Sequence, residues 1–136
     1  MKLLEITNTP LIVEKLESDY WRINEDLSVA YHTDEGVYYW IIKKGFEFNF
    51  RSGGWALSII LPKIGSYAIS WCVHDACYND ETVTRRLSDT LMKKSLRWYG
   101  LNKFYSWLAT KAVRIGGASA YGDDQAELVD FKLLDK

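Results

Sequence analysis

The sequence contains little cysteine, no long hydrophobic run and no recognisable secretory start. Its two cysteines, Cys72 and Cys77, lie five positions apart in a segment that we interpret as helical, so their side chains diverge and stay free thiols. No run approaches the roughly 20 apolar residues that a helix needs to cross a bilayer, and the start MKLLEITNTP lacks a basic region followed by an apolar one. We therefore expect no transmembrane segment and a reducing, cytoplasmic setting.

The sequence also has a small net charge and few histidines. The 17 Lys and Arg residues and 18 Asp and Glu residues give a formal net charge of -1, so no global field attracts nucleic acid or an anionic membrane. A partner of that kind would need a local patch of charge. Only His32 and His74 are available as imidazole ligands, which argues against a zinc centre. The composition thus indicates no nucleic-acid partner.

What the sequence does contain is the composition of one globular domain. Hydrophobic residues make up 48% and charged residues 26% of the 136 residues, which excludes a disordered chain and suits a single core. Six Trp and nine Tyr supply large rigid rings for that core or for a surface that grips a partner. We predict one domain over residues 1–136.

Short β-branched and aromatic runs over about 10–50 predict an antiparallel β-meander. Thr33-Asp34-Glu35-Gly36 followed by VYYWIIKK is a hairpin signal, because Gly36 can take the positive φ of a tight turn. Further on, Phe46, Phe48 and Phe50 alternate with polar residues, which is typical of a half-buried strand.

From about 64 to 116 the hydrophobic period changes to that of helices. A first helix places Tyr67, Trp71, His74 and Tyr78 on one stripe. A second begins near Asp80 or Thr82 and packs antiparallel against the first. A third is capped by Asn102, and one face of it is expected to be buried: Phe104, Trp107, Leu108, Ala112 and Ile115. The fold class is therefore α+β, with a tail over 117–136 that forms an edge strand or stays loose.

The stretch WCVHDACYND carries the most suggestive chemistry. If the second helix returns along the first, Asp89 approaches His74 or the Tyr78 hydroxyl, and a histidine oriented by a carboxylate is the arrangement that general-base catalysis needs. Asp75 is then available to hold a cation or an attacking water. The alternative is structural, because a His-Asp-Tyr cluster also holds two helices together without chemistry.

The chain from about Pro10 to about Gly117 resembles an uncharacterised bacteriophage and prophage family. That family has a Gly-Phe-x-Thr-Asp-x-Ala-Ser loop, a His-Asp-x-x-Tyr helix and a helix with an Arg-rich start and an Asp. The matching positions are Gly45, Phe46, Ser52, His74, Asp75, Tyr78, Arg85 or Arg86, and Asp89. Phe48 stands where the family has Thr and Asn49 where it has Asp, so a loop carboxylate is missing. The resemblance implies a phage protein of the host cytoplasm.

A narrower resemblance is to the active helix of calcium-dependent secreted phospholipases. His74, Asp75, Tyr78 and Asp89 match in type and order, and Cys77 falls where those enzymes often have a cysteine. In those enzymes the His activates water, the adjacent Asp binds calcium and a glycine-rich loop completes the calcium site. The resemblance implies catalytic roles for the four residues, calcium as a candidate cofactor, and Asp75 with Ser52-Gly53-Gly54 as its site.

Partner binding is the competing hypothesis. Trp55 beside two glycines is a candidate interface anchor, and Arg85 and Arg86 open a run of basic residues that is otherwise interpreted as a solvated face. Ser52 is interpreted as a turn residue because no nucleophile elbow surrounds it. Two main functions therefore stay open. One is a His/Asp-dependent hydrolase, and the other is a non-catalytic phage protein that inhibits a host or host-defence factor or belongs to the virion. A third and weaker option is nucleotide or phosphate-ester binding, for which the sequence has no phosphate loop.

Overall fold

A computed structural model describes residues 1–16, 20–49, 67–80, 83–116 and 125–134, and for residues 49 and 112–116 only the backbone. Its elements, in chain order, are β1 (Leu3–Asn8), β2 (Val13–Lys15), β3 (Tyr20–Ile23), β4 (Leu27–Thr33), β5 (Gly36–Ile42), β6 (Glu47–Asn49), α2 (Tyr67–Asn79), α3 (Arg85–Trp98), α4 (Lys103–Gly116), the 3-10 helix η3 (Ala126–Leu128) and β7 (Val129–Leu134). The predicted α+β order, antiparallel strands before three helices, is confirmed.

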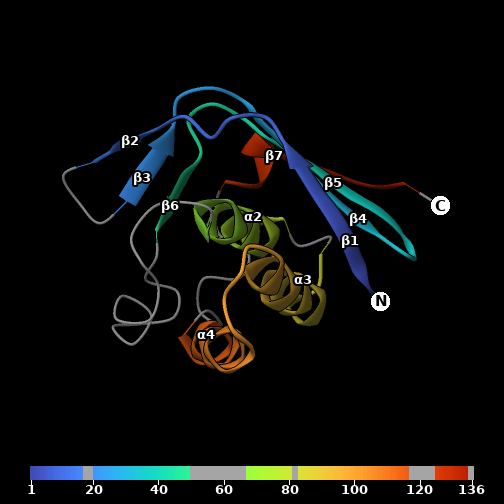
Figure 1. Ribbon diagram of the computed structural model, residues 1–136. Helices are drawn as coiled ribbons and strands as arrows, with labels where there is room; N and C mark the ends of the chain where they lie inside the picture. The colour runs from blue at the N-terminus through green and yellow to red at the C-terminus, as the bar shows by residue number, and fades with distance from the viewer. Residues whose placement is uncertain (17–19, 50–66, 81–82, 117–124, 135–136) are drawn as a thin grey trace.

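The strands form two antiparallel sheets. The larger has the order β1-β4-β5-β7, and the smaller has the order β2-β3-β6. The tail of the sequence supplies β7 as an edge strand, with Val37 opposite Leu134 and Ile42 opposite Val129. The expected run of consecutive strands is thus divided, since β1 and β7 complete the larger sheet around the β4–β5 hairpin (Figure 1).

The β4–β5 hairpin turns where the sequence predicted it. Gly36 has φ 143°, and a Cβ at this position would lie 2.8 Å from the Leu134 carbonyl oxygen, so the turn and the close approach of β7 both require glycine. The Thr33 hydroxyl donates to the Gly36 carbonyl oxygen at 2.7 Å and accepts from the Glu35 N–H at 3.2 Å. These bonds fix the register of the sheet's central pair.

The three helices are layered beneath the strands. Figure 1 shows α2 nearest the sheets, then α3, then α4. The main core lies where the sheets meet α2 and includes the fully buried Trp40, Phe46 and Cys72. A second cluster joins the helices to one another and consists of Trp71, Met92, Leu96, Leu101 and Ala109. α3 therefore has one face that packs in the interior against α2 and another face that lies toward α4.

Local capping residues set the helix ends. α3 begins at Arg85, later than the predicted start near Asp80 or Thr82, because the Thr84 side chain caps it by accepting from the Leu87 N–H at 3.2 Å. Gly100, with φ 104°, follows its last turn. The predicted cap of α4 is confirmed: the Asn102 side chain accepts from the Tyr105 N–H at 2.8 Å.

The predicted buried face of α4 is wrong at its two large rings, Phe104 and Trp107, while Leu108 is half-buried. Phe104 is 62% exposed and Trp107 is 46% exposed, whereas Ser106 and Ala109 are fully buried. Small side chains at positions 106 and 109 allow α4 to approach its neighbours closely, and this turns the large rings outward. The side chains of Ala112 and Ile115 lie outside the described residues. An aromatic surface replaces the expected aromatic core.

Two simpler expectations can be compared directly with the fold. Cys72 and Cys77 are both free, as predicted, and the structure shows that both are buried. Burial raises the pKa of each thiol well above its ordinary value, so these cysteines stay protonated. In the described part of the chain, no helix is long and apolar enough to cross a membrane.

Candidate functional site

The predicted His-Asp-Tyr residues meet between α2 and α3. His74 Nε2 and Asp89 Oδ1 are 2.8 Å apart, and the Tyr78 hydroxyl donates to the same carboxylate oxygen at 2.8 Å. The rings of His74 and Tyr78 lie 4.3 Å apart, one helical turn from each other on α2. Nearer the other end of the pair, the Ser95 hydroxyl of α3 donates to the Ser70 hydroxyl of α2 at 2.7 Å. The two contacts show that the helices run antiparallel.

Hydrogen-bond chemistry assigns the protons of this cluster. An ionised carboxylate only accepts, so His74 Nε2 carries the hydrogen that it shares with Asp89. His74 Nδ1 is buried and makes no hydrogen bond with any residue that the structure describes. Burial raises the pKa of Tyr78 to about 12, partly offset by the Arg85 hydrogen bond, so the phenol remains a donor at neutral pH.

The cluster of His74, Tyr78 and Asp89 is buried within the protein, and we call it the sealed cluster. His74 is 1% exposed and Asp89 is 2% exposed, and their hydrogen-bonded atoms lie between two packed helices. Buried polar networks of this kind hold neighbouring elements in one register, whereas general-base catalysis needs a path for substrate to the base. The burial therefore favours the structural interpretation of the four-residue motif.

Asp75 lies apart from the sealed cluster. It follows His74 directly on α2, where consecutive side chains point about 100° apart, and it is half-buried. Its carbonyl oxygen accepts from the Asn79 side-chain amide at 2.9 Å. Within residues 1–16, 20–49, 67–80, 83–116 and 125–134, no group of three His, Cys, Asp or Glu side chains is placed to hold a metal ion. Calcium binding at Asp75 stays a prediction, as do the catalytic roles of all four residues.

The other predicted site residues separate into three places. Arg85 belongs to the cluster, because its Nε donates to the Tyr78 hydroxyl at 3.4 Å and its guanidinium carbon lies 5.7 Å from the Tyr78 ring centroid. Arg86, its neighbour on α3, lines an open groove. Trp55 and the Ser52-Gly53-Gly54 loop lie outside the described residues.

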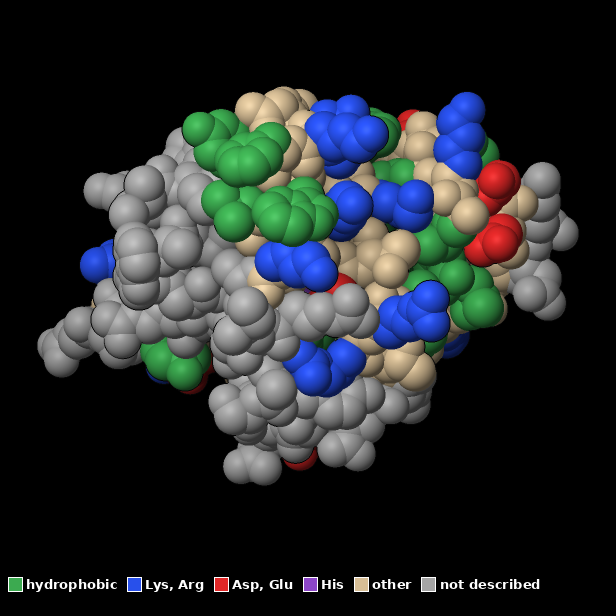
Figure 2. Space-filling model, turned by 90° about the horizontal axis from the view of Figure 1, so that it is seen from below, with side chains coloured by type: hydrophobic (Ala, Val, Ile, Leu, Met, Phe, Trp, Pro, Cys, Tyr) green, Lys and Arg blue, Asp and Glu red, His purple; other side chains and the backbone are tan. Residues whose placement is uncertain are grey.

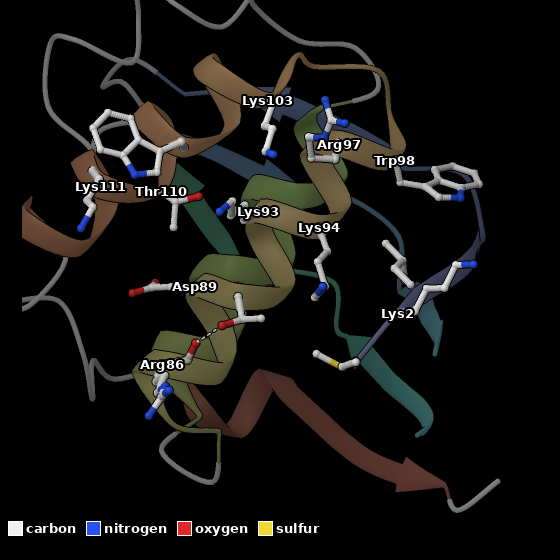
Figure 3. A pocket seen from close by; sticks show the side chains of 14 residues that line it. Lys2, Arg86, Asp89, Lys93, Lys94, Arg97, Trp98, Lys103, Thr110 and Lys111 are labelled. Carbon is white, nitrogen blue, oxygen red and sulfur yellow. Dashed lines mark hydrogen bonds between the residues drawn. The ribbon is translucent and has the colours of Figure 1, made fainter. Parts of the chain in front are cut away.

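That groove is open to the surface and runs between α3, α4 and the start of β1. Its volume is about 840 Å³. The lining includes seven basic side chains and one acidic one, Asp89, and the basic residues are Lys2, Arg86, Lys93, Lys94, Arg97, Lys103 and Lys111. Figure 2 shows Lys and Arg side chains gathered on this face, and Figure 3 shows them approaching the groove from α3 and α4. We call this feature the basic groove.

The basic groove differs from other charged surfaces of the molecule. On the sheets, Arg22 lies 3.4 Å from Glu14 and 3.6 Å from Glu47, and Lys43 lies 3.5 Å from Asp130. Among the described residues, no carboxylate lies within 4.0 Å of a basic side-chain nitrogen in the groove. The groove thus concentrates positive charge on a chain whose formal net charge is -1.

Asp89 connects the sealed cluster to the basic groove. Its carboxylate accepts from His74 and Tyr78 on the inner side, and the residue also contributes to the groove lining. Figure 3 shows it on α3 between Arg86 and Lys93. Because the hydrogen bonds of Asp89 hold α3 in place, they also determine where the basic side chains of α3 lie on the surface.

Sequence reasoning found the basic residues of α3 and α4 but interpreted them as a solvated face. It missed the groove because it assigned Trp107 to the core, and Lys2 lies far from the others in sequence. One signal was available. Ser95, Ser106 and Ala109 are small residues at helix-contact positions, which indicates that the large and charged residues beside them face outward.

Comparisons with known proteins give one match. The sequence model of a family described as "Protein of unknown function (DUF1353)" matches residues 21–113. This region contains most of β3, all of β4 to β6, α2 and α3 with the sealed cluster, and most of α4. Neither a curated protein nor a solved structure matches the chain.

Proposed function

The chain belongs to the DUF1353 family, and from this premise we propose that it is a phage-encoded, non-catalytic interaction protein that captures an anionic partner in the basic groove. One observation carries the proposal: seven basic side chains line the groove and its described lining contains one acid. A host factor, a host-defence factor and a virion component with an anionic surface are the partner classes that this function includes. The phage origin rests on the resemblance of the chain from about Pro10 to about Gly117 to a bacteriophage and prophage family.

Physical chemistry supports anion capture at this place. Like charges held together on a concave, low-dielectric surface focus the potential and raise the local concentration of an oppositely charged partner. Lys93 and Lys94 are half-buried, so their ammonium groups are held near the groove rather than dispersed in solvent. Bringing such cations together is unfavourable in the unbound protein, and an anionic partner relieves that repulsion.

In this proposal the sealed cluster has a structural role. The His74–Asp89 and Tyr78–Asp89 hydrogen bonds fix α3 against α2, and α3 presents Arg86, Lys93 and Arg97 to the groove. A fixed helix keeps those cations in one arrangement, which limits the entropy lost on binding. The His-Asp-Tyr motif, which suggested catalysis in the sequence, thus holds in place the helix that lines the basic groove.

Charge reversal tests the proposal with polyphosphate as the probe. We expect the wild-type protein to bind polyphosphate in low salt and the double variant Lys93→Glu/Arg97→Glu to lose about 30-fold or more in affinity, since it replaces two attractions by two repulsions. The matched control is Lys15→Glu/Lys132→Glu, which makes the same change in net charge on exposed strand positions outside the groove. Isothermal titration calorimetry measures both. Equal losses in the two variants would reduce the effect to net charge and contradict a role for the groove.

The second candidate is a His/Asp-dependent hydrolase resembling the calcium-dependent phospholipases. The observation that favours it is the His74–Asp89 contact at 2.8 Å with the second imidazole nitrogen available to accept a proton. In this candidate His74 is the general base, Asp75 the calcium ligand, and Tyr78 and Asp89 orient the imidazole. Calorimetry with millimolar calcium is the test. Binding that Asp75→Asn abolishes supports the hydrolase, and no calcium binding removes its basis.

A further inference from the structure

We infer that the anionic partner of the basic groove is a single-stranded nucleic acid, with phosphates on the cations and bases stacked on tryptophan rings at the groove's ends. This inference rests on the proposed anion-binding function and names the ligand class. It departs from the indication of the overall composition, because the net charge of -1 conceals a local patch.

The first step is the spacing of the cations along α3. Arg86, Lys93 and Arg97 all line the groove, and they lie seven and four residues apart on one helix. With a rise of about 1.5 Å per residue, the row extends for about 16 Å. A stacked strand advances about 3.4 Å per nucleotide, so the row follows roughly five nucleotides. Lys103 and Lys111 of α4 face it from the other wall (Figure 3).

The second step is the exposure of aromatic rings in the same groove. Trp98 is 45% exposed and Trp107 is 46% exposed, and both belong to the lining. Lys111 Nζ lies 6.0 Å from the Trp107 ring centroid. In Figure 3, Trp98 and Lys111 stand at opposite ends, with Lys93, Lys94 and Arg97 between them. Aromatic rings beside a positively charged track are the elements with which proteins bind single strands.

The third step separates a single strand from other anions. A purely phosphate ligand uses the cations but gains nothing from exposed tryptophans. A duplex keeps its bases stacked on one another, so it offers phosphates to the cations but no open base face to the tryptophan rings. An unpaired strand offers both a charged backbone and open base faces, so it alone uses both features of the groove.

Fluorescence anisotropy with labelled 20-mers of oligothymidine and oligouridine tests the inference, with a duplex of equal length and polyphosphate as competitors. We expect either single strand to bind at least tenfold more tightly than the duplex. The logarithm of the affinity should fall with the logarithm of salt concentration with a slope of about -3, for four to five phosphates contacted. Oligothymidine and oligouridine distinguish DNA from RNA as the source of the shared chemistry.

Substitution of the rings isolates stacking from charge. Trp98→Ala/Trp107→Ala should weaken oligothymidine binding about tenfold or more and leave polyphosphate binding within twofold, because stacking contributes per base and independently of salt. Trp107→Phe in the Trp98→Ala background keeps one ring and should restore part of the affinity. Tyr20→Ala, an aromatic residue 42% exposed on β3 outside the groove, is the matched control and should change neither. Thermal melting by circular dichroism confirms that each variant is folded.

The outcomes separate this inference from the proposed function. Polyphosphate binding that depends on Lys93 and Arg97, combined with oligonucleotide affinity that ignores the tryptophans or does not exceed that of the duplex, overturns the single-strand inference and leaves the proposed function intact. Failure of both polyphosphate and oligonucleotides to bind overturns both. Loss of oligonucleotide binding alone in the tryptophan variant supports the inference.

Discussion

Polar residues on the two faces of α3 have opposite surroundings. On the inner face, Asp89 and Ser95 reach hydrogen-bond partners on α2 at 2.7 to 2.8 Å, and the cluster is closed to solvent. On the outer face, Lys93 and Arg97 line the basic groove, and no carboxylate of a described residue lies within 4.0 Å of their side-chain nitrogens. Groups that a protein satisfies internally stabilise its fold, and charges that it gathers but leaves unmatched are available to a ligand. We therefore expect the function at the basic groove rather than at the His-Asp-Tyr motif.

The largest effect is expected from breaking the inner face. Asp89→Ala removes the acceptor shared by His74 and Tyr78 and leaves both polar groups buried, so the free energy of unfolding should fall by about 3–5 kcal/mol. Urea denaturation followed by tryptophan fluorescence measures the change. The control Asp89→Asn keeps an acceptor oxygen and should lose less. An Asp89→Ala protein as stable as the wild type would mean that the cluster does not hold the helices.

A smaller loss is expected from Tyr78→Phe, at about 1.5–3 kcal/mol for a hydrogen bond to a charged group. This substitution also tests pH dependence. The folded pKa of Tyr78, about 12, exceeds the ordinary 10.0, so its contribution is complete below pH 10 and is lost as pH rises through 12. Urea titrations from pH 9 to 12 should show a shallower alkaline decline in Tyr78→Phe. Tyr105→Phe, at an exposed position, should match the wild type.

The outer face gives a prediction about salt. Lys93→Ala should make the salt dependence of polyphosphate affinity less steep by about 0.7–0.9, because one fewer counterion is released on binding. Lys43→Ala, on the ion-paired sheet surface, should leave the slope unchanged. Affinities measured by calorimetry between 50 and 300 mM NaCl provide both slopes. Equal slopes for the two variants would remove the distinction between the groove and the sheet surface.

The smallest effect links the two faces. Asp89→Asn removes the one acidic side chain among the described lining residues, so polyphosphate affinity should rise about two- to fourfold, as expected for a partly screened charge. The same substitution lowers stability through the inner face. Calorimetry at low temperature measures the gain, and circular dichroism of the same sample checks that the variant is folded. A fall in affinity would show instead that the fold of α3 limits binding more than the local charge does.

Much of the helical part could be predicted from the sequence because local rules determine it. The 4-3-4 spacing from Tyr67 to Tyr78 defines the stripe of α2, and a short connection places α3 antiparallel to it, which brings Asp89 to His74. The Asn102 cap and the Gly36 turn likewise follow from single-residue preferences. The predicted meeting of His, Tyr and Asp needed no long-range information beyond that pairing.

The groove could not be predicted because its parts come from distant segments. Lys2 and Lys111 share it although nothing in their local sequence relates them, and the aromatic rings of α4 follow a helical period that favours burial. Tertiary contact through Ser106 and Ala109 reversed that orientation. The pairing of β7 with β5 depends in the same way on contact between remote strands.

Gln125 shows how the end of the described chain is attached to the rest. Its side-chain amide accepts from the Glu47 N–H and donates to the Glu47 carbonyl, both at 2.8 Å. The two bonds resemble the pair that one residue makes in an antiparallel β-ladder, although the two residues lie 78 positions apart in the sequence. Its own N–H donates to the Asn79 side chain at the end of α2. Contacts this remote form slowly, since a long loop must close first. We therefore expect the helices to pair early in folding, and the closing of β7 and Gln125 onto the sheets to be the late, rate-limiting event.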